Sequence, residues 1–239
     1  MEDNGVLEMV ASVQWHHTFE VLPGVMTKGA YNPLGLWTRL DLPASLAGLR
    51  VLDIGARDGF FSFACEERGA DVLAVDHISQ ESTGFGIASR LRKSNVQYLH
   101  ENLYNLKPDT IGTFDIVLML GVIYHVPDPV LALEIVRNLC VDRAQLYVES
   151  TCIDDAAVFP DRTVDTANLC ELPILLFVHR NNTSFWDLNL KCLTELLVYS
   201  DFVFQSSQTW GQRMLVKAEY WPKANRYSPY APVGRGLRK

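Results

Sequence analysis

The stretch from Val51 to Phe60 constrains this chain more than any other. An apolar run, Val51–Ile54, ends at Gly55, and a second glycine, Gly59, precedes residues with helical spacing. Glycine lets the backbone turn tightly and approach a ligand closely, and the first turn of a helix presents free amide groups. A strand, a glycine turn and a helix in this order predict a ligand-binding turn of an α/β fold. The plain alternative is a strand–helix connection without a ligand.

A carboxylate follows at the place where a ribose would need it. A second apolar strand is expected at Asp71–Val75 and ends at Asp76, 23 residues after Asp53. A carboxylate there can accept hydrogen bonds from both hydroxyls of a ribose. The sequence therefore predicts a nucleoside-containing cofactor.

The spacing of the glycines separates two such cofactors. Dinucleotides require the fingerprint G-x-G-x-x-G, but Arg57 and Phe60 occupy the second and third glycine positions. S-adenosylmethionine has no phosphate and needs a tight turn with a nearby acidic group. The run Asp53-x-Gly55-x-x-x-Gly59 fits that cofactor better.

Apolar runs and helical patterns alternate along residues 50–151, and several of the runs are apolar on both faces. This pattern predicts a parallel sheet covered by helices on both sides, as in a Rossmann-like α/β fold. The segment after Thr151 is expected to be irregular as far as a helix at 188–199. The expected strands are Arg50–Ile54, Asp71–Asp76, Val96–Leu99, Phe114–Leu120, Ala144–Glu149, Phe202–Gln205 and Met214–Ala218, and the expected helices are Val6–Val13, Phe60–Arg68, Glu81–Arg92, Val130–Leu139 and Leu188–Tyr199.

Three regions follow from this pattern. Residues 1–49 form an N-terminal extension or lid, residues 50–219 the cofactor-binding domain, and residues 220–239 a surface tail rich in proline, tyrosine and arginine.

Composition excludes several classes of protein. The 239 residues carry a formal net charge of −7, which disfavours non-specific binding to nucleic acid. Five cysteines occur without a C-x-x-C pair, so neither a disulfide framework nor a zinc site is indicated. No apolar stretch is long enough to cross a membrane, and the acidic N-terminus does not resemble a signal peptide. We expect a soluble cytoplasmic protein.

Two motifs resemble those of a known family. Asp53-Ile54-Gly55-Ala56-Arg57-Asp58-Gly59 resembles motif I of the class I S-adenosylmethionine-dependent methyltransferases. The later run Leu120-Gly121-Val122-Ile123-Tyr124-His125 is similar to a Gly-Val-Leu-Tyr-His stretch in the group typified by the tRNA wobble-uridine carboxymethyltransferase. The resemblance implies a mostly parallel seven-stranded sheet and S-adenosylmethionine as cofactor.

The resemblance also assigns roles to residues of this chain. It places residues near the methionine end of the cofactor, the ribose and the adenine. Those near the methionine end are Asp53, Gly55, Gly59, Leu120 and Gly121; Asp76 holds the ribose; and His77, Ile78, Asn102 and Leu103 contact the adenine.

Two positions depart from that group. Arg57 replaces the usual middle glycine of motif I, and its side chain is expected to point to solvent. Gly35 stands where the RNA-modifying members carry a lysine that helps to bind a carboxylated cofactor. The second departure favours ordinary S-adenosylmethionine.

Tyr124 and His125 are the candidate catalytic residues, because the resemblance projects them between cofactor and acceptor. His125 can act as a general base where the acceptor must lose a proton; a structural histidine that caps the loop before Pro127 is an equal alternative. Tyr124 can orient the substrate or contribute ring packing to the core.

Other candidates have a plain alternative beside the functional one. A cluster of Trp15, His16 and His17 can cover the pocket, with His17 reaching the substrate, although a packed surface turn fits it better. Three aromatic residues of segment 152–187 can form a wall of the acceptor pocket or anchor the segment to the sheet: Phe159, Phe185 and Trp186. Three basic residues of the same region can bind an anionic acceptor or lie in solvent: Arg162, His179 and Arg180. The basic residues of the C-terminal region can contact RNA or be solvated: Lys217, Lys223, Arg226, Arg235, Arg238 and Lys239.

Three functions remain open. The first is a methyltransferase that acts on an oxygen or nitrogen of a small molecule, for which specialised metabolism is one setting. The second is a tRNA wobble-uridine modifying enzyme, and the third is a protein that binds S-adenosylmethionine without catalysis. The acidic charge and Gly35 favour the first, with a small-molecule acceptor rather than nucleic acid as partner.

Overall fold

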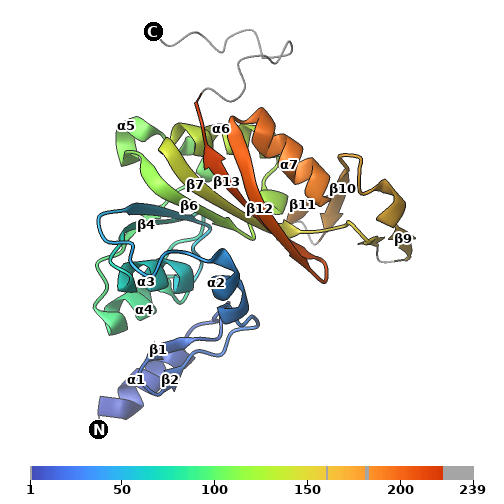
Figure 1. The fold of residues 1–239 in the computed structure, drawn as a ribbon. Coiled ribbons are helices and arrows are strands. Elements are labelled where there is room, and N and C mark those ends of the chain that lie inside the picture. The colour runs from blue at the N-terminus through green and yellow to red at the C-terminus, as the bar shows by residue number, and fades with distance from the viewer. Residues whose placement is uncertain (1, 160, 181–182, 223–239) are drawn as a thin grey trace.

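Seven strands form one central sheet in the order β12-β13-β7-β6-β3-β4-β5 (Figure 1). The structure is a computed structural model that describes residues 2–159, 161–180 and 183–222. Five strands run parallel, and β13 joins β7 antiparallel, so the sheet is mostly parallel, as predicted. The strands are β3 (Arg50–Ile54), β4 (Asp71–Asp76), β5 (Gln97–His100), β6 (Phe114–Leu120), β7 (Cys140–Thr151), β12 (Phe202–Trp210) and β13 (Arg213–Tyr220).

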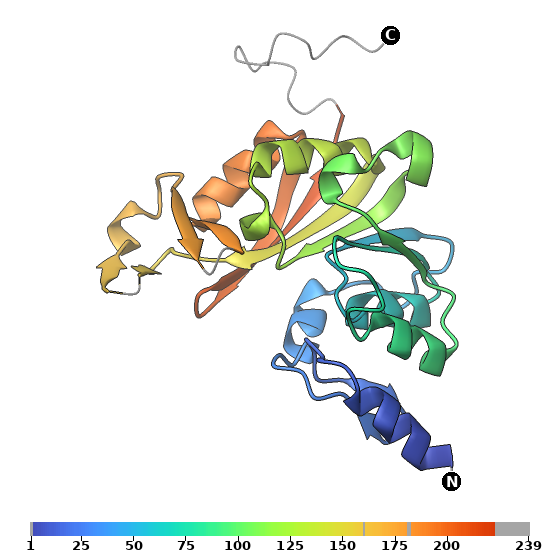
Figure 2. The same ribbon diagram turned by 180° about the vertical axis from the view of Figure 1, so that it is seen from behind.

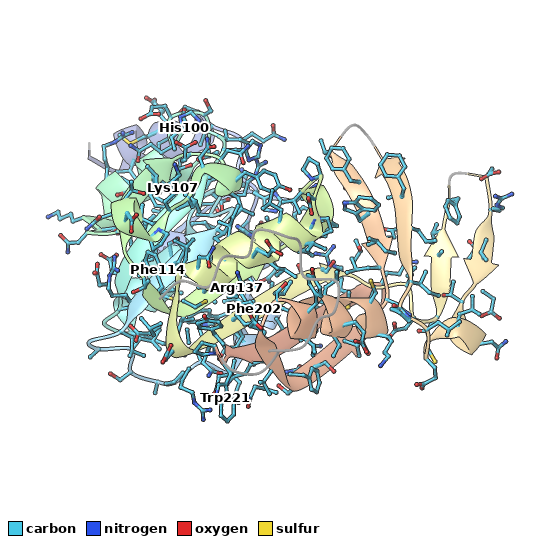
Figure 3. The ribbon with its side chains drawn as sticks, turned by 90° about the horizontal axis from the view of Figure 1, so that it is seen from above. His100, Lys107, Phe114, Arg137, Phe202 and Trp221 are labelled. Carbon is cyan, nitrogen blue, oxygen red and sulfur yellow. The ribbon has the colours of Figure 1, made fainter. Side chains whose placement is uncertain are left out.

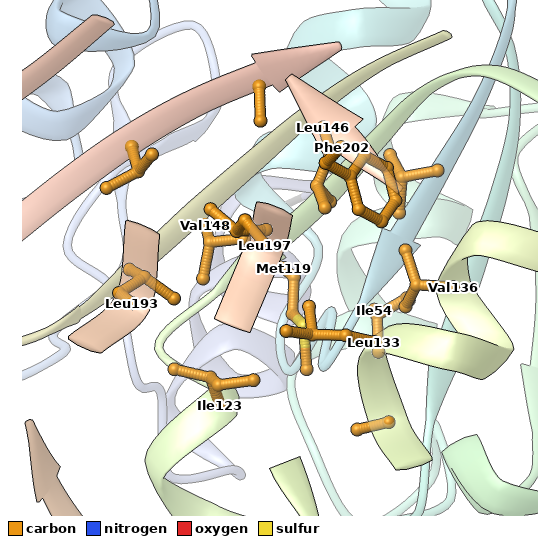
Figure 4. Packing of buried hydrophobic residues seen from close by; sticks show 14 of the residues in the cluster. Ile54, Met119, Ile123, Leu133, Val136, Leu146, Val148, Leu193, Leu197 and Phe202 are labelled. Carbon is orange, nitrogen blue, oxygen red and sulfur yellow. The ribbon is translucent and has the colours of Figure 1, made fainter. Parts of the chain in front are cut away.

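Helices cover both faces of this sheet because its strands are apolar on both faces. Along β6, Val117 and Met119 belong to one buried cluster, while Ile116 and Leu118 belong to the other. Successive side chains of a strand point to opposite faces, so one strand serves both cores. Figure 4 shows the first cluster, in which side chains of β6 and β7 meet Leu133 of one helix.

Each of the two cores is closed by its own layer of helices. The first core is closed by α6 (Pro129–Asn138) and α7 (Leu190–Tyr199), and the second by α2 (Leu34–Leu40), α3 (Phe60–Glu67) and α4 (Phe85–Arg92). Asp128 caps α6 by accepting from the amide of Leu131 at 2.9 Å, and Asn189 caps α7 in the same way.

The short helices are η1 (Leu103–Asn105), α5 (Pro108–Ile111), η2 (Ile123–His125) and η3 (Ala167–Leu169). None of the helices in the described part of the chain has the length and apolar character needed to span a bilayer.

The N-terminal segment is folded against the second layer. Helix α1 (Glu2–Ala11) precedes a small hairpin of β1 (Glu20–Leu22) and β2 (Val25–Met26), which lies beside α4. The Arg92 guanidinium donates to the carbonyl of Glu20 at 3.0 Å. Trp15 and Phe19 are buried and belong to the second core, so this segment is packed against the domain.

Residues 153–188 contain regular structure where we expected an irregular loop. Two antiparallel hairpins, β8–β9 and β10–β11, project from the sheet as an arm (Figures 2 and 3). Their strands are short, and β9 is exposed along its whole length, so the apolar alternation that marks a buried strand is missing. The strands are β8 (Ala156–Val158), β9 (Thr163–Asp165), β10 (Leu175–Arg180) and β11 (Ser184–Leu188).

Other predicted boundaries shift. The helix expected from Glu81 begins at Phe85, and the strand expected at 144–149 extends over 140–151 as β7. Strand β12 continues through the polar run 205–209, because it pairs with β13 at the sheet edge and needs no apolar alternation there. The tail residues Lys223, Arg226, Arg235, Arg238 and Lys239 lie outside the described residues.

Candidate functional site

The carboxyl ends of β3, β4, β5, β6 and β7 meet at one edge of the sheet. The chain leaves β3 toward β4 on one side, while β6 lies on the other side, so β3 and β6 form a topological switch point. In open α/β sheets, ligands bind in the crevice outside the strand ends at such a point. The predicted site residues from motif I and from the β6 end therefore gather here, although they lie more than 60 residues apart in sequence.

The glycine turn after β3 is closed by hydrogen bonds to β4. The Gly55 amide donates to the Val75 carbonyl at 2.8 Å, and the Arg57 amide donates to a carboxylate oxygen of Asp76 at 2.9 Å. Gly55 has φ +77°, and Arg57 adopts the left-handed conformation at φ +52° even though it replaces a glycine. Arg57 is half-buried.

Gly59 faces the protein interior. It has φ +86°, and a Cβ built there would lie 2.5 Å from the Phe63 ring and 2.7 Å from the Phe85 ring. The glycine therefore lets the start of α3 pack against α4, which gives Gly59 a packing requirement besides its predicted role at the cofactor.

Two buried carboxylates stand at the ends of β3 and β4. The Asp53 carboxylate accepts from the Ser62 hydroxyl at 2.6 Å, and burial raises its pKa from 3.8 to about 6. One Asp76 oxygen accepts from the amide of Ile78 at 3.0 Å and lies 3.1 Å from His77 Nδ1. Asp76 thus organises the loop after β4, and its side chain is only 1% exposed.

The residues predicted at the adenine lie around the ends of β4 and β5. His77 is exposed and Ile78 is half-buried, and the His77 carbonyl contacts His100 Nε2 at 3.0 Å, which joins the two loops. Asn102 caps η1 by accepting from an amide at 3.0 Å, while Leu103 is buried in the first core. The fold therefore brings these predicted residues together at one end of the site.

Tyr124 and His125 lie on η2, directly after β6. His125 Nδ1 donates to the carbonyl of Thr183, just before β11. Because Nδ1 carries the proton for this bond, Nε2 keeps its lone pair in the neutral ring. Partial burial lowers the pKa of His125 below its ordinary value, whereas burial raises the pKa of Tyr124.

An ion pair that we did not anticipate lies beside Tyr124. Arg213 of β13 contacts Glu149 of β7 through two nitrogen atoms at 2.5 Å each, and its guanidinium lies 3.4 Å from the Tyr124 hydroxyl. Gly121 completes the group, since a Cβ there would approach that hydroxyl at 3.4 Å. Burial raises the pKa of Glu149, and the opposing effect of Arg213 favours its charged form. The sequence carries one sign of this ion pair, which is that Glu149 is a charged residue in an apolar strand. Its partner Arg213 could not be predicted, because it lies 64 residues away in the chain.

The aromatic candidates of the N-terminal segment and the arm occupy different places. His17 is paired with the buried Asp58, and its own side chain is 12% exposed. Trp15 packs against Gly84, where a Cβ would lie 2.3 Å from the indole ring. Trp186 of β11 donates to the Val126 carbonyl at 2.9 Å and so fixes the arm to η2. Arg162 is exposed and lies over the Phe159 ring, and the side chains of His179 and Arg180 are outside the described part of the chain.

Comparison with known proteins agrees with this geometry. Residues 52–146 match the family described as a methyltransferase domain. This segment of the chain is thus similar to a methyltransferase domain. The seven-stranded, mostly parallel sheet confirms the predicted fold class, and the matched residues include the ends of β3, β4, β5 and β6.

Relatives in sequence share part of the methyltransferase domain. The ubiquinone biosynthesis O-methyltransferase of Bordetella avium is 36% identical over 101 residues, which are 42% of this chain and 42% of that protein. The enzyme of the same name from Acinetobacter baumannii is 29% identical over 133 residues, 54% of this chain and 53% of that protein. The chain thus spans about half the length of the curated relatives it matches.

Solved structures match over a longer range. The N-terminal domain of EvdMO1 with SAH bound has a TM-score of 0.66 and 16% identity, over 92% of this chain and 97% of that chain. The 1,6-didemethyltoxoflavin-N1-methyltransferase of Burkholderia thailandensis, with bound substrate and S-adenosylhomocysteine, has a TM-score of 0.57 and 19% identity. That match covers 79% of this chain and 76% of the other. At these identities the likeness concerns the fold.

Proposed function

We propose that this protein is an S-adenosylmethionine-dependent methyltransferase that methylates an oxygen or nitrogen atom of a small molecule. One observation carries the proposal. In a chain whose residues 52–146 match a methyltransferase domain, Asp76 at the end of β4 holds the amide of Arg57 in the glycine turn after β3. The turn and the carboxylate expected to hold the ribose thus form one unit at the switch point.

The residues present fit the cofactor. Gly55 and Gly121 have φ values of +77° and +71°, so the backbone turns sharply at both strand ends of the switch point, and a Cβ at Gly55 would lie 2.5 Å from the Val122 side chain. When bound, S-adenosylmethionine supplies a methyl group already activated by a sulfonium. The residues proposed to hold it are Asp53, Gly55, Gly59, Leu120 and Gly121 at the methionine end, Asp76 at the ribose, and His77, Ile78, Asn102 and Leu103 at the adenine.

His125 is the proposed general base. The bond from Nδ1 to Thr183 orients the ring, and the lowered pKa keeps the ring neutral near pH 7. Nε2 can then accept the proton that a hydroxyl loses as it attacks the methyl group, or the proton that a neutral amine sheds once it is methylated, while the methyl–sulfur bond would break and S-adenosylhomocysteine would leave. The Tyr124 hydroxyl, held beside Arg213, is proposed to orient the acceptor.

Water exclusion is the other task of a methyltransferase, because the reaction depends on alignment more than on chemical activation. The N-terminal segment and the β10–β11 hairpin lie on either side of the strand ends, and each is tied to the site by hydrogen bonds. We assign both the role of walls of the acceptor site, with residues 1–49 as the cover.

Calorimetry with S-adenosylmethionine and S-adenosylhomocysteine tests cofactor binding, and a coupled assay for S-adenosylhomocysteine release tests turnover against phenols, amines and acids. Binding of both ligands and turnover of at least one acceptor would support the proposal. Absence of binding would overturn it, and binding without turnover across a broad panel would favour the non-catalytic alternative.

A tRNA wobble-uridine substrate is the second candidate, favoured by the Gly121-Val122-Ile123-Tyr124-His125 run. The formal charge of −7 and Gly35 speak against it. An RNA shift assay at several salt concentrations separates the two candidates, because binding through phosphates weakens steeply with salt. Salt-dependent binding of tRNA would favour the second candidate over the first.

A further inference from the structure

Asp58 makes contacts that the cofactor site does not explain. It lies in the glycine turn, yet its carboxylate is buried and points to the N-terminal segment, 41 and 42 residues away in sequence. One oxygen accepts from the amides of His16 at 2.8 Å and His17 at 2.7 Å, and the other pairs with His17 Nδ1 at 2.5 Å. Three donors from one segment thus converge on one carboxylate.

These bonds are strong for a physical reason. A carboxylate only accepts, so His17 must carry a proton on Nδ1 and all three groups act as donors. Hydrogen bonds to a charged acceptor are roughly twice as strong as neutral ones, and burial protects them from competing water. The His17 ring also packs edge-on against Phe61 of α3, with 5.6 Å between the ring centroids.

The anchored residues hold a larger unit together. The Thr18 amide donates to the Tyr31 carbonyl at 2.7 Å, and the Tyr31 amide returns a bond to the His16 carbonyl at 3.1 Å. The Thr27 hydroxyl donates to the His17 carbonyl at 2.7 Å. Residues 15–31, which we call the N-terminal flap, therefore move with His16 and His17.

The flap lies against the glycine turn. The Asp58 carboxylate that holds it belongs to the same turn as Arg57, whose amide donates to the predicted ribose carboxylate of Asp76 at 2.9 Å. His16 is half-buried between the rings of His17 and Tyr31. Asp58 therefore joins the flap to the turn that is proposed to hold the cofactor.

We propose that Asp58 is a positioning residue that clamps the N-terminal flap onto the glycine turn, so that the flap covers the bound cofactor and slows its release. The inference rests on the proposed function. It also changes the expectation for His17, because a side chain held by Asp58 serves the clamp and does not reach the substrate.

The test compares three variants with the wild-type chain, using S-adenosylhomocysteine as the probe. Asp58→Ala leaves two buried amides unpaired, whereas Asp58→Asn keeps an accepting oxygen for them, and its amide group can donate to the other tautomer of His17. Asp115→Ala is the matched control. Asp115 accepts from the Arg50 amide at 2.8 Å, but at the amino ends of β3 and β6, away from the site.

Stopped-flow displacement measures release, and hydrogen exchange measures protection of residues 15–31. We expect Asp58→Ala to release the probe about 20-fold faster and to lose flap protection, since three bonds to a charged group are lost. The association rate should change by less than about threefold, because the clamp acts on the closed state. Asp58→Asn should stay within about fivefold of wild type, and Asp115→Ala should match wild type.

Equal release rates for Asp58→Ala and wild type would overturn the clamp, as would a loss confined to the association rate. If Asp58→Ala does not fold, His17→Phe keeps the two amide bonds and the ring packing, and should still release the probe about fivefold faster. If wild-type protein does not bind the probe, the proposed function fails instead. Hydrogen exchange without the probe then still shows whether Asp58 holds the flap.

Discussion

The cofactor side and the acceptor side of this site are built in different ways. The proposed cofactor side comes from the ends of β3, β4, β5 and β6 and the loops directly after them, within the matched residues 52–146. The proposed acceptor side combines η2 with Glu149 and Arg213 of the sheet edge and with Thr183 and Trp186 of the arm. Most of these residues lie outside the matched segment.

This difference follows from what each side must recognise. A cofactor of fixed chemistry can be held by short loops at strand ends, and those loops are local in sequence. An acceptor that varies among related enzymes is recognised by segments that can change without disturbing the sheet. We therefore expect substitutions on the cofactor side to change cofactor affinity, and substitutions on the acceptor side to change turnover or local stability without changing cofactor affinity.

The largest expected effect is on turnover, through the acceptor side. His125→Ala should lower the rate of S-adenosylhomocysteine release from an accepted substrate by about 100-fold or more, since the proton acceptor is lost. S-adenosylhomocysteine affinity should stay unchanged, which separates the two sides. His125→Asn is the control, because its amide can donate to Thr183 but cannot take a proton. If the Asn variant keeps the wild-type rate, His125 orients and does not act as a base.

The next effect concerns stability, on the cofactor side. Folding raises the Asp53 pKa from 3.8 to about 6, so the folded state binds more protons than the unfolded state in that range. The free energy of unfolding should therefore fall as the pH rises from 4 to 6, by about 2–3 kcal/mol. Asp53→Asn should remove this loss and raise the melting temperature at pH 7 but not at pH 4.

The same variant should bind S-adenosylhomocysteine more weakly, because the carboxylate is proposed to serve the methionine end. Thermal melts across pH 4–7 and calorimetry measure the two effects. An Asn variant that is less stable than wild type at pH 7 would contradict the sign of the pKa shift.

Asp76→Ala should weaken S-adenosylhomocysteine binding by about 1–3 kcal/mol, the scale of hydrogen bonds to a charged group. The substitution also frees the amides of Arg57 and Ile78 that Asp76 holds. Calorimetry measures the affinity. Unchanged affinity would mean that the ribose is held elsewhere and that the cofactor side extends beyond the ends of β3 and β4.

The smallest effect tests the arm. Trp186→Phe keeps an aromatic ring but removes the bond from the indole nitrogen to the Val126 carbonyl, so the free energy of unfolding should fall by about 1 kcal/mol. S-adenosylhomocysteine affinity should not change. Trp221→Phe is the control, since Trp221 is 44% exposed. If Trp186→Phe binds S-adenosylhomocysteine markedly more weakly than wild type, the arm contributes to cofactor binding and the two sides are not separate.

Where strands were buried, the sequence predicted them well. The expected strands Arg50–Ile54 and Phe114–Leu120 coincide with β3 and β6, because strands covered on both faces must be apolar throughout. The arm and the far part of β12 were missed. Strand β9 and the far part of β12 are mostly exposed, and their backbone pairing leaves no periodic apolar pattern in the sequence.

The sequence by itself determined the order of strands and helices, the glycine turn and the carboxylate at the end of β4, because each depends on residues that are close in the chain. Only the tertiary structure decided that Arg213 pairs with Glu149, that Thr183 orients His125 and that Asp58 holds the flap. Those contacts join residues 41 to 64 positions apart. No local pattern encodes such a contact, since it forms only when the packed sheet brings the two segments to the same edge.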